Sequence, residues 1–106
     1  MTGHAGLRWQ DGTPRVAHLS GEIDVANAGE LFAIVKAGVD GTGVVDLSDV
    51  SFVDSSALNQ LVQLHNDIEL RIVAAPGTPP RRLLELTGLT QVFEIYAELE
   101  SALGDQ

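Results

Sequence analysis

The sequence predicts a single α/β domain: a mixed, mostly parallel sheet of four or five strands with about four helices, in the order β-β-α-β-α-β-α-β-α. Three observations lead to this class. Strand-like apolar segments alternate with segments of helical periodicity, an Asp-Gly pair separates the first two strand-like segments, and 106 residues suffice for one core. The alternation favours a parallel sheet that carries helices, and Asp-Gly favours an antiparallel hairpin at its edge. We therefore take residues 1–106 as one domain with its core at about 5–103.

The first third of the chain is expected to form the hairpin and one helix. Residues 6–10 and 15–19 are the two strands, and residues 20–24 are a polar turn. Asp24 can cap the helix that follows, because its side chain can accept a hydrogen bond from a free N–H group of the first turn. The apolar side of that helix has members at offsets of 3, 7 and 10 and consists of Val25, Ala28, Phe32 and Val35.

The middle of the chain predicts a buried strand that leads into a second helix. Residues 44–47 form the strand, residues 48–49 interrupt it, and residues 50–53 continue in an extended conformation. The helix opens at the Asp54-Ser55-Ser56 sequence. Its apolar face consists of Leu58, Leu61, Val62 and His65, and its other face of Ser55, Ser56, Asn59, Gln60 and Gln63.

The last third predicts two more strands and two more helices. Residues 70–74 and 92–96 are the strands. Thr78 and Pro79 suit the start of the third helix, and Gly88 suits a left-handed terminator. A short helix over 97–103 ends the domain. We expect most helices on one face of the sheet, with Leu58, Leu61, Val73, Leu84 and Phe93 buried.

The composition excludes several classes of function. The chain has no cysteine, which removes disulfides, thiol catalysis and cysteine-ligated zinc. Six Lys and Arg residues face fifteen Asp and Glu residues, for a net charge of −9, so there is no basic stripe for nucleic acid. No apolar run approaches the ~18 residues of a membrane span, and the first residues do not resemble a signal peptide. We expect a cytoplasmic protein with no cofactor, no metal, no nucleic-acid ligand and no membrane insertion.

The start of the second helix is the segment best suited to carry a function. Two hydroxyl groups and a carboxylate lie where the first N–H groups of a helix have no backbone partner. Free donors and the helix dipole favour negative charge there, so a phosphate would be received locally at little cost. From the residues alone, the commoner interpretation is that Asp54 or Ser55 is only an N-cap.

Ser55 does not have the surroundings of a hydrolase nucleophile. Such a serine needs a base within hydrogen-bond reach. His65 follows on the same helix about 15 Å further along its axis, and His18 belongs to a strand. No Gly-x-Ser-x-Gly sequence occurs, and no acidic residue is spaced with either histidine as a metal ligand set. We therefore expect no enzyme activity and no catalytic residue.

Three ordered segments carry a resemblance to the STAS domain family, and within it to bacterial anti-sigma-factor antagonists. Residues 44–58 (VVDLSDVSFVDSSAL) resemble the family signature. Residues 19–24 (LSGEID) resemble its strand-to-helix turn, and residues 82–89 (RLLELTGL), followed by 92–95, resemble its third helix and last strand. The resemblance covers roughly residues 5–103. The sequence departs from the family in having Ala57 and Asn59 where glycine is common, and in a short connection between residues 64 and 70.

The resemblance implies a switch set by phosphate on Ser55. The unphosphorylated antagonist would sequester an anti-sigma factor of histidine-kinase-like ATPase fold and so free a sigma factor for transcription in a stress response. That partner would phosphorylate Ser55 and be released, and a serine phosphatase of the PP2C type would reset the switch. The implied partner-binding residues are Glu22, Asp24, Asp54, Ser55, Ser56, Asn59, Gln60 and Gln63.

From the residues alone, these side chains can also have ordinary structural roles instead of binding a partner. Glu22 and Asp24 can be a turn acid and an N-cap, and the polar stripe of Asn59, Gln60 and Gln63 can be an ordinary solvated helix face. Another use of the family is also open: a constitutive STAS subunit of an ABC-type transport system or of a stress-signalling complex, without a serine switch. The double serine favours the switch.

Overall fold

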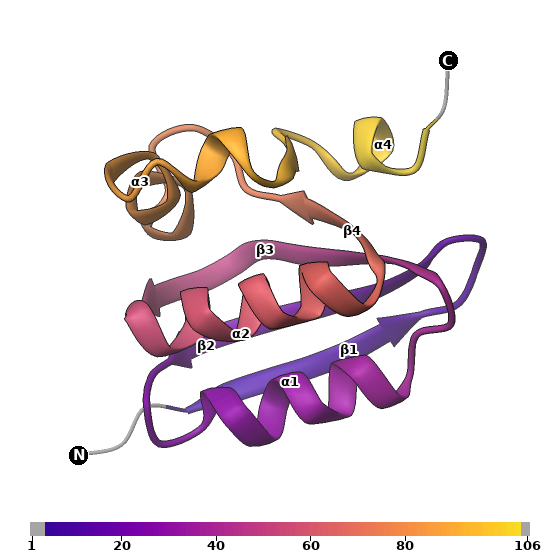
Figure 1. Cartoon of the computed structure of the whole chain (residues 1–106), viewed down its shortest axis with the longest axis horizontal. Coiled ribbons are helices and arrows are strands. Elements are labelled where there is room, and N and C mark those ends of the chain that lie inside the picture. Colours follow the sequence, from indigo (N-terminus) through magenta and orange to yellow (C-terminus); the bar gives the residue numbers. More distant parts are fainter. Residues whose placement is uncertain (1–3, 105–106) are drawn as a thin grey trace.

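The computed structural model describes residues 4–104, which form one five-stranded sheet with helices on both faces (Figure 1). The order of strands and α-helices is the one that the sequence predicts, with a short 3₁₀ helix, η1, before the last strand. The elements are β1 (Ala5–Gln10), β2 (Arg15–Ile23), α1 (Ala28–Ala37), β3 (Thr42–Val53), α2 (Ser55–Asp67), β4 (Glu69–Val73), α3 (Pro79–Leu86), η1 (Leu89–Gln91), β5 (Glu94–Tyr96) and α4 (Leu99–Ala102).

The sheet is mixed, with the strand order β1-β2-β3-β4-β5. The β1–β2 hairpin is antiparallel, as the Asp-Gly pair predicts, and the other three pairs are parallel. Each parallel pair is joined by a helical crossover, because parallel strands cannot be joined by a tight turn. The carboxyl ends of the parallel strands therefore lie at one edge of the sheet.

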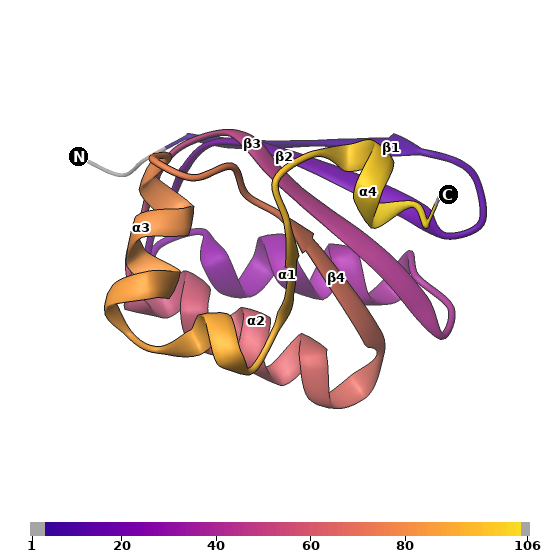
Figure 2. The ribbon, with the colours of Figure 1, turned by 90° about the horizontal axis from the view of Figure 1, so that it is seen from above.

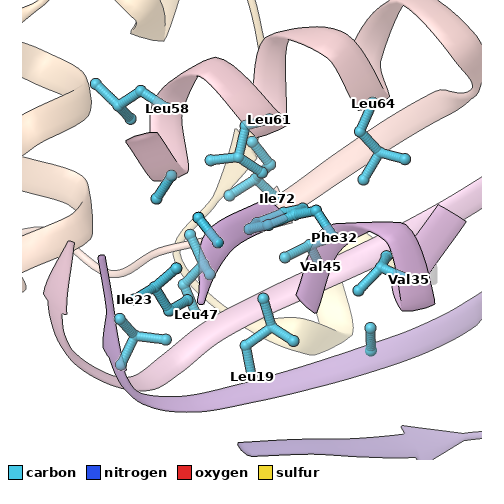
Figure 3. Close-up of a cluster of buried hydrophobic side chains, with 14 of the residues drawn as sticks. Leu19, Ile23, Phe32, Val35, Val45, Leu47, Leu58, Leu61, Leu64 and Ile72 are labelled. Carbon is cyan, nitrogen blue, oxygen red and sulfur yellow. The ribbon is translucent and has the colours of Figure 1, made fainter. Parts of the chain in front are cut away.

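The main core lies between the sheet and the helices α1, α2 and α3. Its members include Val45 and Ile72 from the central strands, Phe32 from α1 and Leu61 from α2 (Figure 3). Successive residues of a strand point to opposite faces. Val44 and Val73 consequently pack on the second face, against Ala102 of α4, on the side of the sheet away from α1 and α2 (Figure 2).

The burial predicted for five side chains is confirmed, and so is the preference of the helices for one face. Leu58, Leu61, Leu84 and Phe93 belong to the main core. Val73 is buried too, but on the second face under α4.

Two strands are longer than the sequence predicts. β2 continues to Ile23, so residues 20–23 are strand instead of a polar turn, and β3 is continuous through residues 48–49. The physical reason is pairing. β2 and β3 remain partners up to Ile23 and Val53, and two register shifts, between His18 and Ser20 and between Gly21 and Glu22, each absorb one extra residue of β3.

The helices differ from the predictions at their ends. α1 begins at Ala28, so Val25 precedes it and is 78% exposed instead of buried. On α2, Ala57 and Leu64 are buried, whereas the expected Val62 and His65 are half-buried. β5 is shorter than predicted because the N–H groups of Val92 and Phe93 still bond to the carbonyl of Leu89 in η1, which follows the left-handed Gly88 (φ 76°). α4 is shorter because its caps are Glu98 and Leu103.

Candidate functional site

The candidate site lies at the carboxyl ends of β2 and β3. Ile23 is in register with Val53, so Asp24 and Asp54 follow neighbouring parallel strands at the same edge of the sheet. α2 begins there with Ser55 and Ser56. The topology thus brings together residues that are about thirty positions apart in the sequence.

Asp54 caps α2. Its backbone is extended (φ −123°, ψ −172°), and its Oδ1 accepts a hydrogen bond of 2.9 Å from the backbone N–H of Ser56. Its carbonyl oxygen accepts from the N–H groups of Ala57 and Leu58. The sequence leads us to expect free N–H donors at this helix start that could receive a phosphate. That expectation is wrong in detail, because Asp54 already accepts from most of the N–H groups of the first turn. A phosphate on this helix would instead meet a carboxylate.

The two serines differ in their exposure. Ser55 is the first residue of α2 and is exposed, whereas Ser56 is half-buried. The Ser55 hydroxyl has no hydrogen-bond partner within residues 4–104. The Ser55 hydroxyl can therefore be reached from solvent without breaking a hydrogen bond of the described residues.

The β2–α1 turn beside this helix start is held by side chains. Oδ1 of Asp24 accepts from the N–H of Ala26, and the Asp24 N–H donates to Oδ1 of Asn27 at 3.0 Å in each case. Asn27 also donates its Nδ2 to the carbonyl of Glu22. Asp24 therefore holds a turn before the helix instead of capping it, which explains why α1 starts at Ala28. Asn27 was not predicted, although an Asp-x-x-Asn sequence after a strand is a readable turn signal.

The polar stripe of α2 divides into two parts. Asn59 is exposed and lies one helical turn beyond Ser55. Gln60 and Gln63 border a shallow groove of about 200 Å³ between α1 and α2, which also includes Gly29 and the paired residues Lys36 and Asp67. Asn59 thus shares the surface of Ser55, and the two glutamines extend it toward α1.

Exposed apolar side chains surround the site, and sequence periodicity did not single them out. Phe52 is 49% exposed at the end of β3, and Val25 lies in the turn beside Asp24. On α3, Leu86 is 77% exposed and borders a groove of about 260 Å³ with Val53. Exposed apolar groups gathered at one edge are typical of a surface that binds protein.

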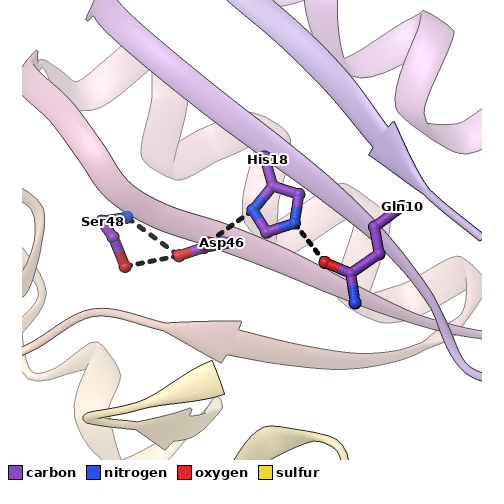
Figure 4. Close-up of polar contacts among 4 residues, drawn as sticks. All are labelled: Gln10, His18, Asp46 and Ser48. Atoms are coloured by element: carbon purple, nitrogen blue, oxygen red, sulfur yellow. Dashed lines mark hydrogen bonds and ion pairs between the residues drawn. The ribbon is translucent and has the colours of Figure 1, made fainter. Parts of the chain in front are cut away.

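Two of the three histidines, His18 and His65, lie away from Ser55, whereas the backbone carbonyl of the exposed His4 accepts from the N–H of Glu22 at 2.8 Å. His18 is on the second face, where Nδ1 is 2.6 Å from Oδ2 of Asp46 and Nε2 is 2.8 Å from Oε1 of Gln10 (Figure 4). Asp46 precedes the end of β3 by about 23 Å of strand. His65 packs edge-on against Phe93, with ring centroids 5.4 Å apart. Neither His18 nor His65 can serve as a base for Ser55.

Among residues 4–104, no group of three His, Cys, Asp or Glu side chains is arranged to hold a metal ion. Over the same residues, no helix has the length and apolar character needed to cross a bilayer.

The family model for the STAS domain matches residues 7–102. Among solved structures, an anti-sigma factor antagonist from Mycobacterium paratuberculosis is similar with a TM-score of 0.83 and 30% identity, over 94% of this chain and 92% of that one. The phosphorylated form of the Bacillus cell fate determinant SpoIIAA is similar with a TM-score of 0.62 and 20% identity, over 91% of this chain and 96% of that one. The second likeness concerns the fold alone.

A curated relative of another kind matches a shorter part of itself. A D-alanine–D-alanine ligase B from Bradyrhizobium diazoefficiens is 35% identical over 89 residues, which are 80% of this chain and 22% of that protein. The chain thus spans about a fifth of that relative's length. The ligase's activity is therefore not carried over to this chain.

Proposed function

The chain belongs to the STAS domain family, and on that premise we propose that it is an anti-sigma-factor antagonist switched by phosphorylation of Ser55. The similarity to the antagonist from Mycobacterium paratuberculosis supports the general role. The observation that carries the switch is local: Ser55 is exposed at the first position of α2, without a hydrogen-bond partner in the described chain, and two carboxylates follow the neighbouring strands beside it.

The electrostatics of this arrangement favour release on phosphorylation. Phosphoserine adds about 1.5 to 2 negative charges and a bulky group. Asp54 already accepts the Ser56 N–H, so the phosphate would have to share this edge with the Asp54 and Asp24 carboxylates. Charge is screened beyond about 8 Å in physiological salt, so the effect acts on a partner that covers the helix start. Burying that charge under a partner is unfavourable, and each ~1.4 kcal/mol lost weakens binding tenfold.

We propose that the partner surface consists of Glu22, Asp24, Asp54, Ser55, Ser56, Asn59, Gln60 and Gln63. The exposed Phe52, in register with Glu22, and the exposed Val25, which follows Asp24, would add apolar contact area. In this proposal an anti-sigma factor of histidine-kinase-like ATPase fold binds there in the cytoplasm. Sequestering it frees a sigma factor for transcription in a stress response.

The partner would supply the ATP and the catalytic base for the phosphoryl transfer. The γ-phosphoryl group of ATP would move to the Oγ of Ser55, ADP would leave, and the hydroxyl proton would pass to a base of the kinase. His18 and His65 of this chain lie away from Ser55 and are engaged by other residues. A serine phosphatase of the PP2C type would hydrolyse the phosphoserine with water and restore the binding form.

The first experiment tests the site of the switch. The histidine-kinase-like anti-sigma factors of the source organism are purified and incubated one by one with this chain and ATP. Intact mass and phosphopeptide mapping should find one phosphate on Ser55. Ser56→Ala should still accept it. Phosphate confined to Ser56, or full phosphorylation of Ser55→Ala, would contradict the proposal.

Binding measurements with the same kinases test the consequence. Ser55→Ala should bind and not be released by ATP, whereas Ser55→Asp should weaken binding at least ~10-fold, equivalent to ~1.4 kcal/mol. Asn59→Lys should weaken binding, and Asn66→Lys, the same change at the exposed far end of α2, is the matched control. A transporter ATPase that binds this chain whether or not Ser55 is phosphorylated would favour the constitutive-subunit alternative.

A further inference from the structure

A cleft of about 660 Å³ lies at the amino ends of the parallel strands, at the end of the sheet opposite Ser55. It is bordered by the β1–β2 hairpin, the connection from α1 to β3, the strand β4 and the residues after α4. The hairpin and α4 are seen at the same end of the molecule in Figure 2. Its polar lining consists of Thr13, Arg15, Asp40, Thr42 and Arg71. The volume is within the range of small-molecule sites.

Arg15 is held in place by three neighbours. Its Nη1 donates to the carbonyl of Gly38 at 2.7 Å, its Nε donates to Asp11 at 3.1 Å, and its guanidinium lies 4.0 Å from the centre of the Trp9 ring. Asp11 is largely exposed, so this ion pair contributes little and remains exchangeable. The Nη2 group of Arg15 stays available to a ligand, on a guanidinium that is already ordered.

Arg71 is a half-buried cation without an ion pair to any residue in the range 4–104. Its Nη1 donates to the carbonyl of Ala102 at 2.9 Å, and its Nε is buried with no hydrogen-bond partner in that range. Partly buried charges are usually paired, because burial without a counter-charge is unfavourable. Within residues 4–104 its register partner on β5 is the acidic Glu94, which accepts from the Tyr96 hydroxyl and forms no ion pair with Arg71.

We propose that this cleft binds a small oxyanion, a phosphate or carboxylate group, between the guanidinium groups of Arg15 and Arg71. Two of the six basic residues of the chain line it, against a single carboxylate, that of Asp40. Guanidinium groups match the geometry of both oxyanions. The Thr13 hydroxyl, exposed and unpaired within residues 4–104, adds a neutral donor at the rim. The net charge of −9 does not prevent binding, because distant carboxylates are screened.

The site is independent of the proposed switch. β3 runs from Thr42 at the cleft to Val53 at the candidate site, which is about 36 Å of strand. A ligand in the cleft would neither touch Ser55 nor compete with a protein bound there. The test below uses this chain alone and stands whatever the outcome of the kinase experiments.

The experiment is a titration followed by amide chemical shifts, at constant ionic strength in a chloride buffer. Inorganic phosphate and succinate are the two probes, so the arms distinguish a phosphate ligand from a carboxylate one. We expect saturable shifts confined to residues 12–15, 38–42, 71 and 103–104, with a dissociation constant of about 1 mM or below for at least one anion. Linear shifts with both anions would overturn the proposal.

Matched variants decide whether the two arginines are responsible. Arg15→Gln and Arg71→Gln should each raise the dissociation constant at least tenfold. Arg82→Gln, the same change of charge at an exposed position on α3, should leave it unchanged. Thr13→Glu places a carboxylate at the rim without altering either arginine or a buried group, and should abolish binding. Equal affinity in Thr13→Glu and the wild type would exclude the cleft even if the arginine variants fold poorly.

Discussion

The two faces of the sheet are stabilised by different interactions. On the face covered by α1, α2 and α3, the buried cluster is apolar, with side chains from three strands meeting the helices (Figure 3). On the other face, a small apolar group under α4 is followed by a polar chain of contacts across β1, β2 and β3: Gln10 to His18, His18 to Asp46 and Asp46 to Ser48 (Figure 4).

The difference shows what each face contributes. Apolar burial is strong but non-directional, so it fixes the helices on the sheet without demanding one partner for each side chain. The polar chain is directional. Asp46 is 8% exposed and accepts from the backbone N–H and the hydroxyl of Ser48, while its other oxygen faces His18. A shift of one residue between β2 and β3 would break these contacts, so the polar face specifies the register.

The largest effect is expected on the apolar face. Ile72→Ala removes a fully buried side chain (0% exposed) and should lower the free energy of unfolding by about 3 kcal/mol, through lost burial and the cavity left behind. Urea denaturation measures it. Val25→Ala, at an exposed position, is the control and should change stability by less than ~0.5 kcal/mol. Equal losses for the two variants would refute the division into faces.

A smaller but clear loss is expected when the polar chain is broken. Asp46→Ala leaves the His18 ring and the Ser48 N–H without their acceptor in a largely buried place, which should cost about 2 kcal/mol. Asp49→Ala is the same change three residues further along β3, at an exposed side chain. If both variants unfold at the same urea concentration, the polar chain does not stabilise the fold.

The helix start at the candidate site should respond more weakly than either face. Asp54→Ala removes the cap that accepts from the Ser56 N–H and should cost about 1 kcal/mol. Ser55→Ala leaves that cap in place and should be nearly neutral in thermal denaturation. A larger loss for Ser55→Ala than for Asp54→Ala would show that the serine has a structural role.

The smallest effect belongs to the outer end of the polar chain. Gln10→Ala deletes the contact to Nε2 of His18 at the edge strand β1, where water can replace the amide, so about 0.5 kcal/mol is expected. Hydrogen exchange is the more sensitive readout, since β1 should lose protection before β3 does. Uniform exchange changes across all five strands would contradict this gradient.

Local signals explain why the sequence predicted much of the fold. Three helix boundaries depend on residues within one turn of the chain, and each lies where it was predicted. They are the start of α2 at Asp54, the start of α3 at Thr78 and Pro79, and the left-handed Gly88 that follows α3. The errors lie where a neighbouring element overrides the local pattern. Residues 48–49 read as an interruption, yet pairing with β2 keeps them in the strand.

The site shows the same division. The order of the elements and the position of Ser55 at a helix start could be predicted from the residues, because periodicity and capping depend on positions only a few apart. No pattern of nearby residues placed Asp24 beside Asp54, which only the family resemblance implied, and none indicated that His18 meets Asp46 or that Arg15 shares a cleft with Arg71. Those pairs are 28 to 56 positions apart, and strand register and helix packing, which no local pattern encodes, bring them together.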